Sequence, residues 1–336
     1  MLKRLLVLLF IPFILCSCTN NIEEISFSSW GSVTETKILN KLISDYEKNN
    51  PEVKINFIHI PQNYFQKIHL LFASSTAPDV IFINNLYLPV YKNQLEDLTS
   101  IVNTKDFYPQ TTKALSIDGK LYAIPRDISN FVFFYNKNIT GDINPDWTFN
   151  DFEKLIKNTS NDKHYGLSYE RDIYWASPYL ETLGFENGIK FYKNLESKYA
   201  PTPAQVGSST QAQMFLDGKL GLYLSGRWLF PKISETAEFP YGIVTFPGIV
   251  TADASGWAIS KNSKHKIQAL KFVKYLSSKE SIDYFTDTGL IIPARIDSSE
   301  KIKERAFLDA IPKSVPRKPD INFNKTRDSL NKQFFN

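Results

Sequence analysis

The chain has 336 residues, of which 43% are hydrophobic and 22% charged, and 39 Lys and Arg against 35 Asp and Glu give a formal net charge of +4. These values exclude an intrinsically disordered chain, and the length is sufficient for two lobes. Basic residues are interspersed with acidic ones, so no polycationic tail or stripe indicates a nucleic-acid partner. Aromatic residues make up 14% of the chain, which is more flat apolar surface than a core of this size requires.

The first 17 residues have the pattern of a secretory signal peptide. Lys3 and Arg4 precede the apolar run 5–16, which is shorter than the ~20 residues of a membrane-spanning helix. Leu15-Cys16-Ser17-Cys18 resembles a bacterial lipobox, and predicts that Cys18 becomes the lipidated N-terminus. We therefore expect an extracytoplasmic protein, in the periplasm or on the outer face of the cell membrane, anchored by lipid. The alternative is an ordinary signal peptide with an incidental cysteine.

Strands and helices are predicted to alternate after a short tether at residues 18–24. A strand from Ile25 ends at Trp30, and Ser32 and Glu35 fit a capping box at the start of a helix that ends before Pro51. The next segments read as a strand, a helix and a buried strand, at 53–57, 63–73 and 79–83. A β-α-β-α-β order favours a mainly parallel sheet covered by helices, in which ligands bind at the carboxyl ends of the strands.

The rest of the chain predicts a second sheet. Its run 131–135 is too apolar for a surface strand, so we expect it in the middle of that sheet. The other elements are expected as strands at 220–224 and 257–259, a tight turn at Asp118-Gly119, and helices within 149–156, 188–195, 209–216 and 267–276. The basic, proline-containing tail from Pro312 onward is expected to be only half ordered.

The sequence offers no convincing catalytic or metal-binding constellation. Its four histidines show no metal-ligand spacing, and Asp118-Gly119-Lys120 and Asp217-Gly218-Lys219 lack the remainder of a phosphate-binding loop. No G-x-S-x-G nucleophile elbow occurs. We therefore expect no cofactor, no metal ion and no enzymatic activity. Carboxylates are plentiful, however, and a glycoside-hydrolysing acid pair depends on a spatial separation that a sequence does not contain.

Four of the five tryptophans lie at predicted ends of elements rather than inside them. They are Trp30, Trp175 after Tyr174, Trp228 after Arg227, and Trp257 after Ser255-Gly256. Aromatic rings at such positions can stack on the C–H faces of a sugar while neighbouring polar groups bond its hydroxyls. The pattern favours a carbohydrate-binding site, although a place in the core remains the alternative for each ring taken singly.

Several short motifs occur in the order found in one known family. They are the strand ending in Trp30 before a capped helix, Ser75-Thr76-Ala77-Pro78-Asp79-Val80, Gly119-Lys120-Leu121-Tyr122-Ala123-Ile124-Pro125-x-Asp127, Phe134-Tyr135-Asn136-Lys137, Asp217-Gly218-Lys219 running to Gly226-Arg227-Trp228, Ser255-Gly256-Trp257-Ala258-Ile259, and Gly289 with Pro293 and Arg295. In this series the chain resembles the family 1 extracellular solute-binding proteins, the maltose-binding-protein-like components of bacterial ABC sugar importers. The motifs cover about residues 25 to 295.

The resemblance implies an α/β, two-lobed periplasmic-binding-protein (Venus-flytrap) fold with hinge crossings and a ligand in the cleft. The N-lobe would comprise residues 25–127 and 256–295, and the C-lobe residues 128–255 and 296–336. The implied partners are a carbohydrate, the transmembrane subunits of an ABC permease and its cytoplasmic ATPase. The protein itself would be a monomer without covalent chemistry.

The resemblance also implies roles for individual residues. Trp228 corresponds to the family's stacking aromatic, Trp257 stands near the second crossing, and Asp127 would accept hydroxyl bonds at the first. Asn84 and Asn85 occupy a place where members often carry a ligand-binding acid, which leaves the particular sugar open. The complete set of expected ligand-binding residues is Trp30, Asn84, Asn85, Asp127, Tyr174, Trp175, Arg227, Trp228, Trp257 and Arg295.

Three alternatives remain open at this stage. If two of Arg126, Arg227 and Arg295 face the cleft, an anionic ligand such as a sugar phosphate or glycerol phosphate is favoured, because guanidinium groups match phosphate oxygens. An anchored glycan-degrading enzyme would instead need two carboxyl groups ~5–10 Å apart in one cleft. A structural or adhesive lipoprotein would have no concave site.

Overall fold

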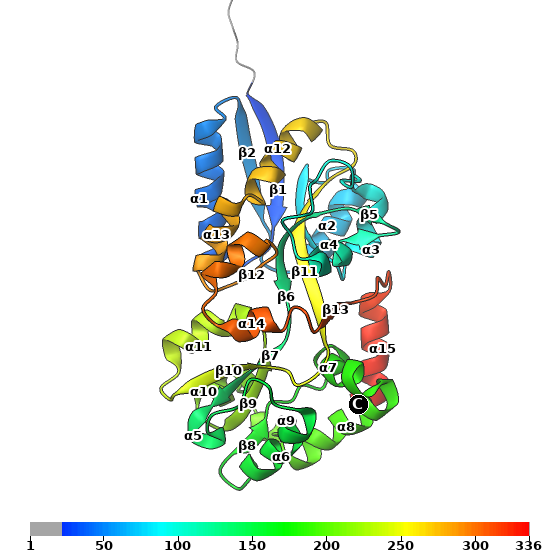
Figure 1. Ribbon diagram of the computed structural model, residues 1–336. Coiled ribbons are helices and arrows are strands. Elements are labelled where there is room, and N and C mark those ends of the chain that lie inside the picture. Colours follow the sequence, from blue (N-terminus) through cyan, green and yellow to red (C-terminus); the bar gives the residue numbers. More distant parts are fainter. Residues whose placement is uncertain (1–21, 336) are drawn as a thin grey trace, which may run out of the picture.

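The computed structural model describes residues 22–335, which form a seven-stranded sheet and a four-stranded sheet with helices around each (Figure 1). The seven-stranded sheet lies in the upper half of the view and the four-stranded sheet in the lower half. The predicted signal peptide and the predicted lipidation site Cys18 lie outside the described residues. Within residues 22–335, none of the helices is both long and apolar enough to cross a membrane.

The larger sheet combines the N-terminal strands with later segments of the chain. Its members are β1 (Glu23–Ser29), β2 (Val53–His59), β3 (Val80–Asn84), β6 (Ile124–Ser129), β11 (Val250–Ile259), β12 (Ile292–Pro293) and β13 (Ser314–Pro316). They follow the order β12-β6-β11-β3-β1-β2, and β13 pairs with β11. β1 runs parallel to β2 and β3, whereas β11 runs antiparallel to β3 and β6. β1 begins at Glu23, inside the predicted tether, because Glu23 and Glu24 pair with β2.

The first half of the chain also supplies most helices around this sheet. They are α1 (Val33–Asn49), α2 (Tyr64–Ala73), α3 (Leu88–Tyr91), a 3-10 turn η1 (Lys92–Gln94), α4 (Pro109–Ala114), α12 (Lys266–Leu276) and α13 (Lys279–Asp287). The predicted capping box of α1 is confirmed, since the Glu35 backbone N–H donates to Ser32 Oγ and the Ser32 N–H donates to Glu35 Oε2. Asp118-Gly119 joins the short hairpin strands β4 (Ser116–Ile117) and β5 (Lys120–Leu121), as predicted.

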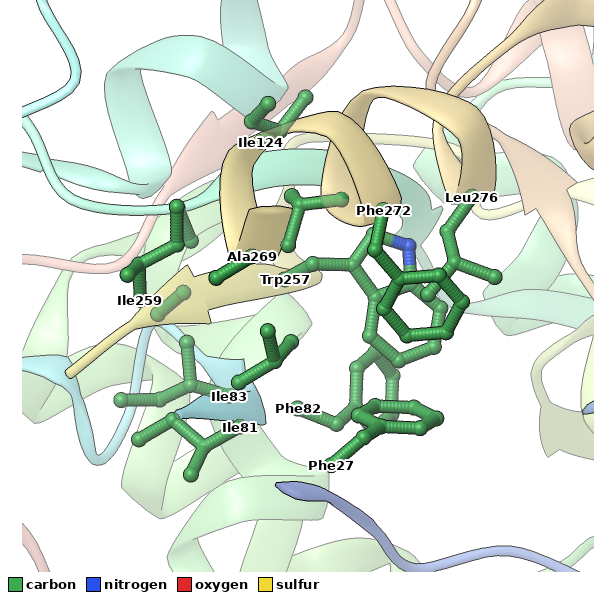
Figure 2. Close-up of a cluster of buried hydrophobic side chains, with 14 of the residues drawn as sticks. Phe27, Ile81, Phe82, Ile83, Ile124, Trp257, Ile259, Ala269, Phe272 and Leu276 are labelled. Atoms are coloured by element: carbon green, nitrogen blue, oxygen red, sulfur yellow. The ribbon is translucent and has the colours of Figure 1, made fainter. Parts of the chain in front are cut away.

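The core of this half forms where the sheet meets helix α12. In Figure 2 the indole of Trp257 stands among Phe27, Phe82 and Phe272. Its ring centroid lies 4.6 Å from that of Phe82 and 5.5 Å from that of Phe27. Burying such large aromatic side chains contributes about 2–3 kcal/mol each relative to exposure, so this cluster is a main source of stability for the half.

The four-stranded sheet has the order β10-β7-β9-β8. Its strands are β7 (Val132–Asn136), β8 (Tyr165–Leu167), β9 (Leu220–Ser225) and β10 (Tyr241–Thr245). Along β7, Phe133 and Tyr135 face one apolar cluster while Val132 and Phe134 face another. Because both faces of the strand are buried, its sequence is continuously apolar, which confirms the predicted place of residues 131–135.

Helices cover both faces of this second sheet. They are α5 (Lys137–Thr140), α6 (Phe149–Thr159), α7 (Ile173–Leu183), α8 (Phe185–Lys198), α9 (Pro203–Val206), α10 (Gln211–Leu216), η2 (Arg227–Leu229), α11 (Phe230–Thr236), α14 (Arg305–Asp309) and α15 (Phe323–Phe335). The 3-10 turn η3 (Ile296–Lys301) instead packs against α13 and β12 of the larger-sheet half. The helices expected within 149–156, 188–195, 209–216 and 267–276 are therefore present as α6, α8, α10 and α12.

The strands β6 and β11 lie where the two halves of the molecule meet, and short connections lead from them into the second sheet. β6 and β11 run side by side through the middle of the molecule (Figure 1), and two residues after its end β6 continues into β7 of the second sheet. β11 pairs with β13 at Val250 and with β3 at Ile259. Its register against β6 shifts between Ser255 and Gly256. A Cβ at Gly256 would lie 2.3 Å from the Ile124 carbonyl oxygen, so the close approach of the two strands requires glycine.

The carboxyl-terminal tail corrects the expectation of partial order. After β13 it forms helix α15, which lies against α7 (Figure 1). Arg327 pairs with Asp172, and the Asn331 side chain accepts a hydrogen bond from the Ile173 N–H. Phe335 is buried against the second sheet's core. Tertiary contacts hold this helix, whose own pattern is too polar to predict it.

Candidate functional site

A cavity of about 320 Å³ lies between the two sheets, beside the strands that join them. Its walls include residues at or just after the carboxyl ends of β1, β3 and β9, together with parts of β6 and β11. The full lining is Trp30, Glu35, Asn84, Leu86, Arg126, Asp127, Ile128, Ser129, Tyr174, Arg227, Trp228, Asp253, Ser255, Leu290, Ile291 and Ile292. Ligands of α/β sheets commonly bind at this end of the strands.

The structure brings six of the predicted ligand-binding residues together at this cavity. They are Trp30, Asn84, Asp127, Tyr174, Arg227 and Trp228. They come from both halves of the molecule, because Trp30 and Asn84 follow strands of the larger sheet and Trp228 follows a strand of the smaller one. A molecule in the cavity would therefore touch both halves at once.

Trp228 is the exposed aromatic of the site. It lies in the 3-10 turn η2, remains 41% exposed, and its ring stands edge-on to that of Phe131 at 6.2 Å. The indole folds back over Gly226 so closely that a Cβ there would lie 1.8 Å from a ring carbon. The glycine therefore makes room for the observed position of the ring at the cavity wall.

Trp30 presents a second aromatic surface. One side of it packs on the core, with ring centroids 4.2 Å from Phe82 and 4.9 Å from Tyr64. The indole is only partly buried and also lines the cavity. Its orientation is thus fixed by tight packing before any ligand arrives, which lowers the entropy lost on binding.

Trp257 requires a correction. Its side chain is completely buried in the core of Figure 2 and does not line the cavity. Helix α12 packs against β11, and the Trp257 ring lies among the buried rings of Phe82 and Phe27. The bulky ring therefore belongs to the core rather than to a ligand-binding surface.

Three other predicted residues also lie outside the cavity lining. Asn85 is buried, donates to Asp253 and accepts from the Ala254 N–H, so it joins β3 to β11. Trp175 packs beside Phe131 on the second core, with ring centroids 5.0 Å apart. Arg295 makes two hydrogen bonds to Asp297 and reaches Asp106 at 3.4 Å. Each of these three side chains contacts neighbouring protein groups and does not line the cavity.

Arg126, Asp127 and Glu35 form a charged cluster on the cavity wall. Arg126 Nε donates to Asp127 Oδ2 at 2.5 Å, and its Nη1 donates to Glu35 Oε1 at 3.3 Å. The Arg126 guanidinium also lies 4.1 Å above the centroid of the Phe82 ring. Burial raises the pKa of the Asp127 carboxyl, and the adjacent arginine opposes that rise.

Arg227 precedes Trp228 in η2, and its side chain contacts the other half of the molecule. Its Nη1 donates to the backbone carbonyls of Thr286 and Ile291, and Nη2 lies 3.8 Å from Glu304. Burial lowers the pKa of the guanidinium, whereas Glu304 opposes this effect. Arg227 therefore joins the two halves through fixed carbonyl groups.

Asp253 is the polar centre of the crossing strand β11. Its Oδ1 accepts from the Asn85 amide at 3.0 Å, and its Oδ2 accepts from the Tyr174 hydroxyl at 2.9 Å. Arg317, from the carboxyl-terminal tail, donates to both oxygens. The carboxylate is thus bonded by groups from three separate parts of the chain.

Sequence reasoning missed Glu35 and Asp253 as cavity residues. Glu35 was already explained by the capping box, which hides a second contact to Arg126. Asp253 is recognisable as the one charged residue in the otherwise uncharged run 250–259. A lone acid in a buried strand needs a partner and is therefore a useful signal.

The cavity offers hydrogen-bonding groups and aromatic faces rather than a metal centre. Within residues 22–335, no group of three or more His, Cys, Asp or Glu side chains is arranged to hold a metal ion. The walls combine carboxylate, amide, hydroxyl and guanidinium groups with two indoles. Such a mixture suits a polar guest with flat apolar faces.

The fold is that of a two-lobed solute-binding protein, and the comparison with known families agrees. The profile of the bacterial extracellular solute-binding proteins matches residues 41–308. The chain belongs to this family, which confirms the resemblance and the fold class expected from the motifs. The exact residue limits of the two lobes stay a prediction.

Two curated relatives from Bacillus subtilis (strain 168) illustrate the similarity. A maltodextrin-binding protein is 25% identical over 60% of this chain and 57% of its own length. A galactooligosaccharide-binding protein is 21% identical over 66% of this chain and 50% of its own length. The chain thus spans about half of the length of each of these relatives.

Solved structures show the fold over almost the whole chain. An ABC substrate-binding protein from Listeria monocytogenes in complex with cycloalternan has a TM-score of 0.80 at 24% identity, covering 93% of this chain and 92% of its own. The sugar-binding protein MalE from Xanthomonas citri has a TM-score of 0.79 at 21% identity, with 92% and 90% covered. At such identities the likeness concerns the fold alone.

Proposed function

We propose that the protein is the lipid-anchored substrate-binding protein of an ABC importer, which captures a mono- or oligosaccharide in the cavity and delivers it to the membrane permease. The N-lobe of residues 25–127 and 256–295 would close on the C-lobe of residues 128–255 and 296–336. A maltodextrin-binding relative and a cycloalternan-bound structural neighbour support a carbohydrate ligand.

The observation that carries the proposal is the pairing of two indoles across one cavity. Trp30 belongs to one half and Trp228 to the other, and both line the same hollow. Sugar rings have apolar C–H faces and a rim of hydroxyl groups, so they match aromatic surfaces surrounded by polar atoms. An indole from each half would hold the guest from two sides.

The charges of the cavity favour a neutral ligand over a phosphorylated one. Its lining holds three carboxylates against two guanidinium groups, which gives a formal charge of −1. Arg126 is already paired with Asp127 and Glu35. Arg227 donates to backbone carbonyls and lies 3.8 Å from the Glu304 carboxylate. A phosphate would therefore meet no uncompensated cation in this lining.

Closure would follow from ligand contacts with both halves. A guest touching Trp30 and Trp228 stabilises the conformation in which the two rings approach each other, and it shifts the equilibrium only by its preference for that conformation. Short connections, residues 130–131 between β6 and β7 and residues 246–249 between β10 and β11, join the two sheets. Hinge bending would thus be confined to a few residues, among them the irregular pair Ser255 and Gly256.

We also propose that the protein binds without catalysing a reaction and needs no cofactor. Two of the three cavity carboxylates, Asp127 and Asp253, each accept hydrogen bonds from an arginine. They are thereby engaged in contacts within the protein rather than standing as a free acid and base. Release of products from a glycan substrate would contradict this part of the proposal.

Isothermal titration calorimetry with a ligand panel tests the function. The panel contains maltose, maltotriose, a galactooligosaccharide and glycerol phosphate, and we expect binding of at least one neutral sugar and none of glycerol phosphate. Trp228→Ala should weaken that binding by about tenfold or more. The control is Tyr284→Ala, which removes an aromatic of similar exposure outside the cavity and should leave affinity unchanged.

Two outcomes of this titration would contradict the proposal. Tight binding of glycerol phosphate alone would establish the polyol phosphate alternative. Failure of every sugar, or equal affinity in the wild type and Trp228→Ala, would remove the aromatic cavity as the binding site. Native mass spectrometry of freshly purified protein adds a ligand-independent approach, because a retained guest reports its own mass.

The proposed anchor and partners need separate experiments. The wild-type mature chain should carry a diacylglyceryl modification at Cys18 and co-purify with membranes, whereas Cys18→Ala should be released. Co-purification of two permease subunits and an ATPase with the anchored protein would support delivery to an importer. A monomer is expected in size-exclusion chromatography with light scattering.

A further inference from the structure

Arg317 connects the carboxyl-terminal tail to the wall of the cavity. It follows β13, which runs parallel to β11, and its backbone N–H donates to the Ala252 carbonyl. This pairing places the side chain beside Asp253, where Nε lies 3.1 Å and 3.2 Å from the two carboxylate oxygens. Both side chains are largely buried, at 15% and 11% exposure. In that position the ion pair is poorly screened by water.

The same guanidinium also holds helix α7. Its Nη2 donates to Ser177 Oγ at 3.0 Å, and that hydroxyl in turn donates to the Tyr174 carbonyl. The guanidinium carbon of Arg317 lies 4.4 Å from the centroid of the Tyr174 ring. Arg317 therefore contacts the crossing strand through Asp253 and the first turn of α7 through its backbone and its aromatic ring.

Asp253 has little capacity left for a ligand. A carboxylate offers about four acceptor sites, and Asn85, Tyr174 and Arg317 supply hydrogens to both oxygens. Tyr174 lines the same cavity, and its hydroxyl is bonded to Asp253, another residue of the cavity wall. Because its proton is directed to Asp253, the remaining lone pairs of Oη can accept a hydrogen bond from a guest.

The surroundings keep the Tyr174 hydroxyl protonated, so that it donates to Asp253. Burial is the main cause that raises the pKa of Tyr174, and the Asp253 carboxylate adds to the rise while Arg317 and Arg327 oppose it. A hydroxyl that donates to a carboxylate becomes a better acceptor, because successive hydrogen bonds polarise one another. The chain of contacts runs from Arg317 through Asp253 to Tyr174.

We propose that Arg317 is a positioning residue for ligand recognition: through Asp253 it fixes the Tyr174 hydroxyl as a hydrogen-bond acceptor for a hydroxyl group of the bound sugar. This inference rests on the proposed carbohydrate function and extends it to a residue that does not line the cavity. It makes the tail after residue 313 a part of the binding site. The ligand chemistry required is a hydroxyl donor, which every sugar supplies.

The tail offers a matched control for this role. Arg327, on α15, pairs with Asp172, and its guanidinium carbon lies 5.6 Å from the centroid of the same Tyr174 ring, but among the described residues it makes no hydrogen bond or ion pair with Asp253. Arg327→Ala loosens the attachment of the tail while leaving the chain of contacts from Arg317 in place. If the tail matters only as packing, the two alanine variants should behave alike.

The test is a double-mutant cycle measured by calorimetry with the tightest-binding sugar of the panel above. Arg317→Ala should weaken binding by about tenfold in the wild-type background. In the Tyr174→Phe background, which lacks the hydroxyl, the same substitution should change affinity by less than about twofold. Arg327→Ala should also stay within about twofold, and Arg317→Lys, which retains the charge, should restore part of the loss.

Each contrary result overturns the inference. Equal losses from Arg317→Ala with and without the Tyr174 hydroxyl would show that the arginine acts by packing alone. Losses of the same size in Arg317→Ala and Arg327→Ala would assign the effect to tail attachment. Unchanged affinity in Arg317→Ala, with binding by the wild type intact, would refute the role directly.

Failure of the proposed function is recognised separately, because the wild type itself would then bind no sugar. In that case the coupling between Arg317 and Asp253 is measured by urea unfolding of Arg317→Ala, Asp253→Asn and the double variant. Less-than-additive shifts of the midpoint are expected, since each single change breaks the same ion pair. Additive shifts would contradict the coupling between the two side chains.

Discussion

Gly226→Ala is the substitution that separates ligand binding from stability most cleanly. The added Cβ would lie 1.8 Å from one carbon of the Trp228 ring and 2.3 Å from two others. The ring must retreat by roughly 2 Å to restore ordinary carbon–carbon contact at about 3.5–4.0 Å. The backbone itself accepts alanine, because φ at this residue is −116°. The variant therefore displaces the indole without altering the main chain.

Displacement of the Trp228 ring should weaken sugar binding and leave the stability of the protein almost unchanged. Trp228 is 41% exposed, so its ring can swing toward solvent with little loss of packing. An aromatic stacking contact is worth about 0.5–1.5 kcal/mol, which corresponds to roughly two- to tenfold in Kd. We expect this loss in calorimetric titration with the sugar that the wild type binds, and a change in unfolding free energy below about 1 kcal/mol in urea.

Gly242→Ala provides the opposite case. A Cβ there would lie 2.1 Å from the Tyr135 ring, which is 6% exposed and has no solvent to swing into. Overpacking of this kind costs about 1–3 kcal/mol of stability, whereas the cavity is untouched. If Gly226→Ala bound the sugar as tightly as the wild type, or if Gly242→Ala weakened binding equally, the assignment of Trp228 to the ligand site would be refuted.

Three further predictions follow from buried groups and the anchor. Trp257→Phe should lower the unfolding free energy by about 1–3 kcal/mol through lost core volume yet leave sugar affinity unchanged, because the indole lies away from the cavity; a selective loss of affinity would return it to the site. Burial raises the pKa of Asp127 above 3.8. The protonated carboxyl therefore contributes to the stability of the folded state below that pH, and this contribution is lost as the pH rises through the folded-state pKa. The unfolding free energy of the wild type minus that of Asp127→Asn, measured from pH 3.5 to 7, should fall with pH, and a flat difference would contradict the raised pKa. Cys18→Ala should move the protein from the membrane fraction to the soluble fraction in its host, and an unchanged distribution would argue for another anchor.

Local patterns predicted the elements that depend on short-range physics. The capping box at Ser32 and Glu35, the tight turn at Asp118-Gly119 and the doubly buried strand at 131–135 all have signals within a few residues. Trp30 and Trp228 both line the cavity, and each directly follows the carboxyl end of a strand, one in each sheet, which is a position that the local pattern does indicate. These features needed no knowledge of distant contacts.

The misplaced residues depend on contacts between distant segments. Trp257 looks like a strand-end aromatic, but it lies in the same buried core cluster as Phe272 of the later helix α12. The tail lacks a strong apolar period, yet the pair Arg327–Asp172 and the burial of Phe335 hold it as a helix. Asp253 acquires its partners from three regions of the chain. A local pattern contains none of this information.

The measurement that tests the central claim most directly is a crystal structure of the protein with the sugar that binds most tightly in the titration. The account predicts the sugar in the cavity between the two sheets, with a ring stacked on Trp228 and contacts to Trp30 in the other half. A sugar bound elsewhere on the surface, with the cavity empty and both indoles free, would contradict it.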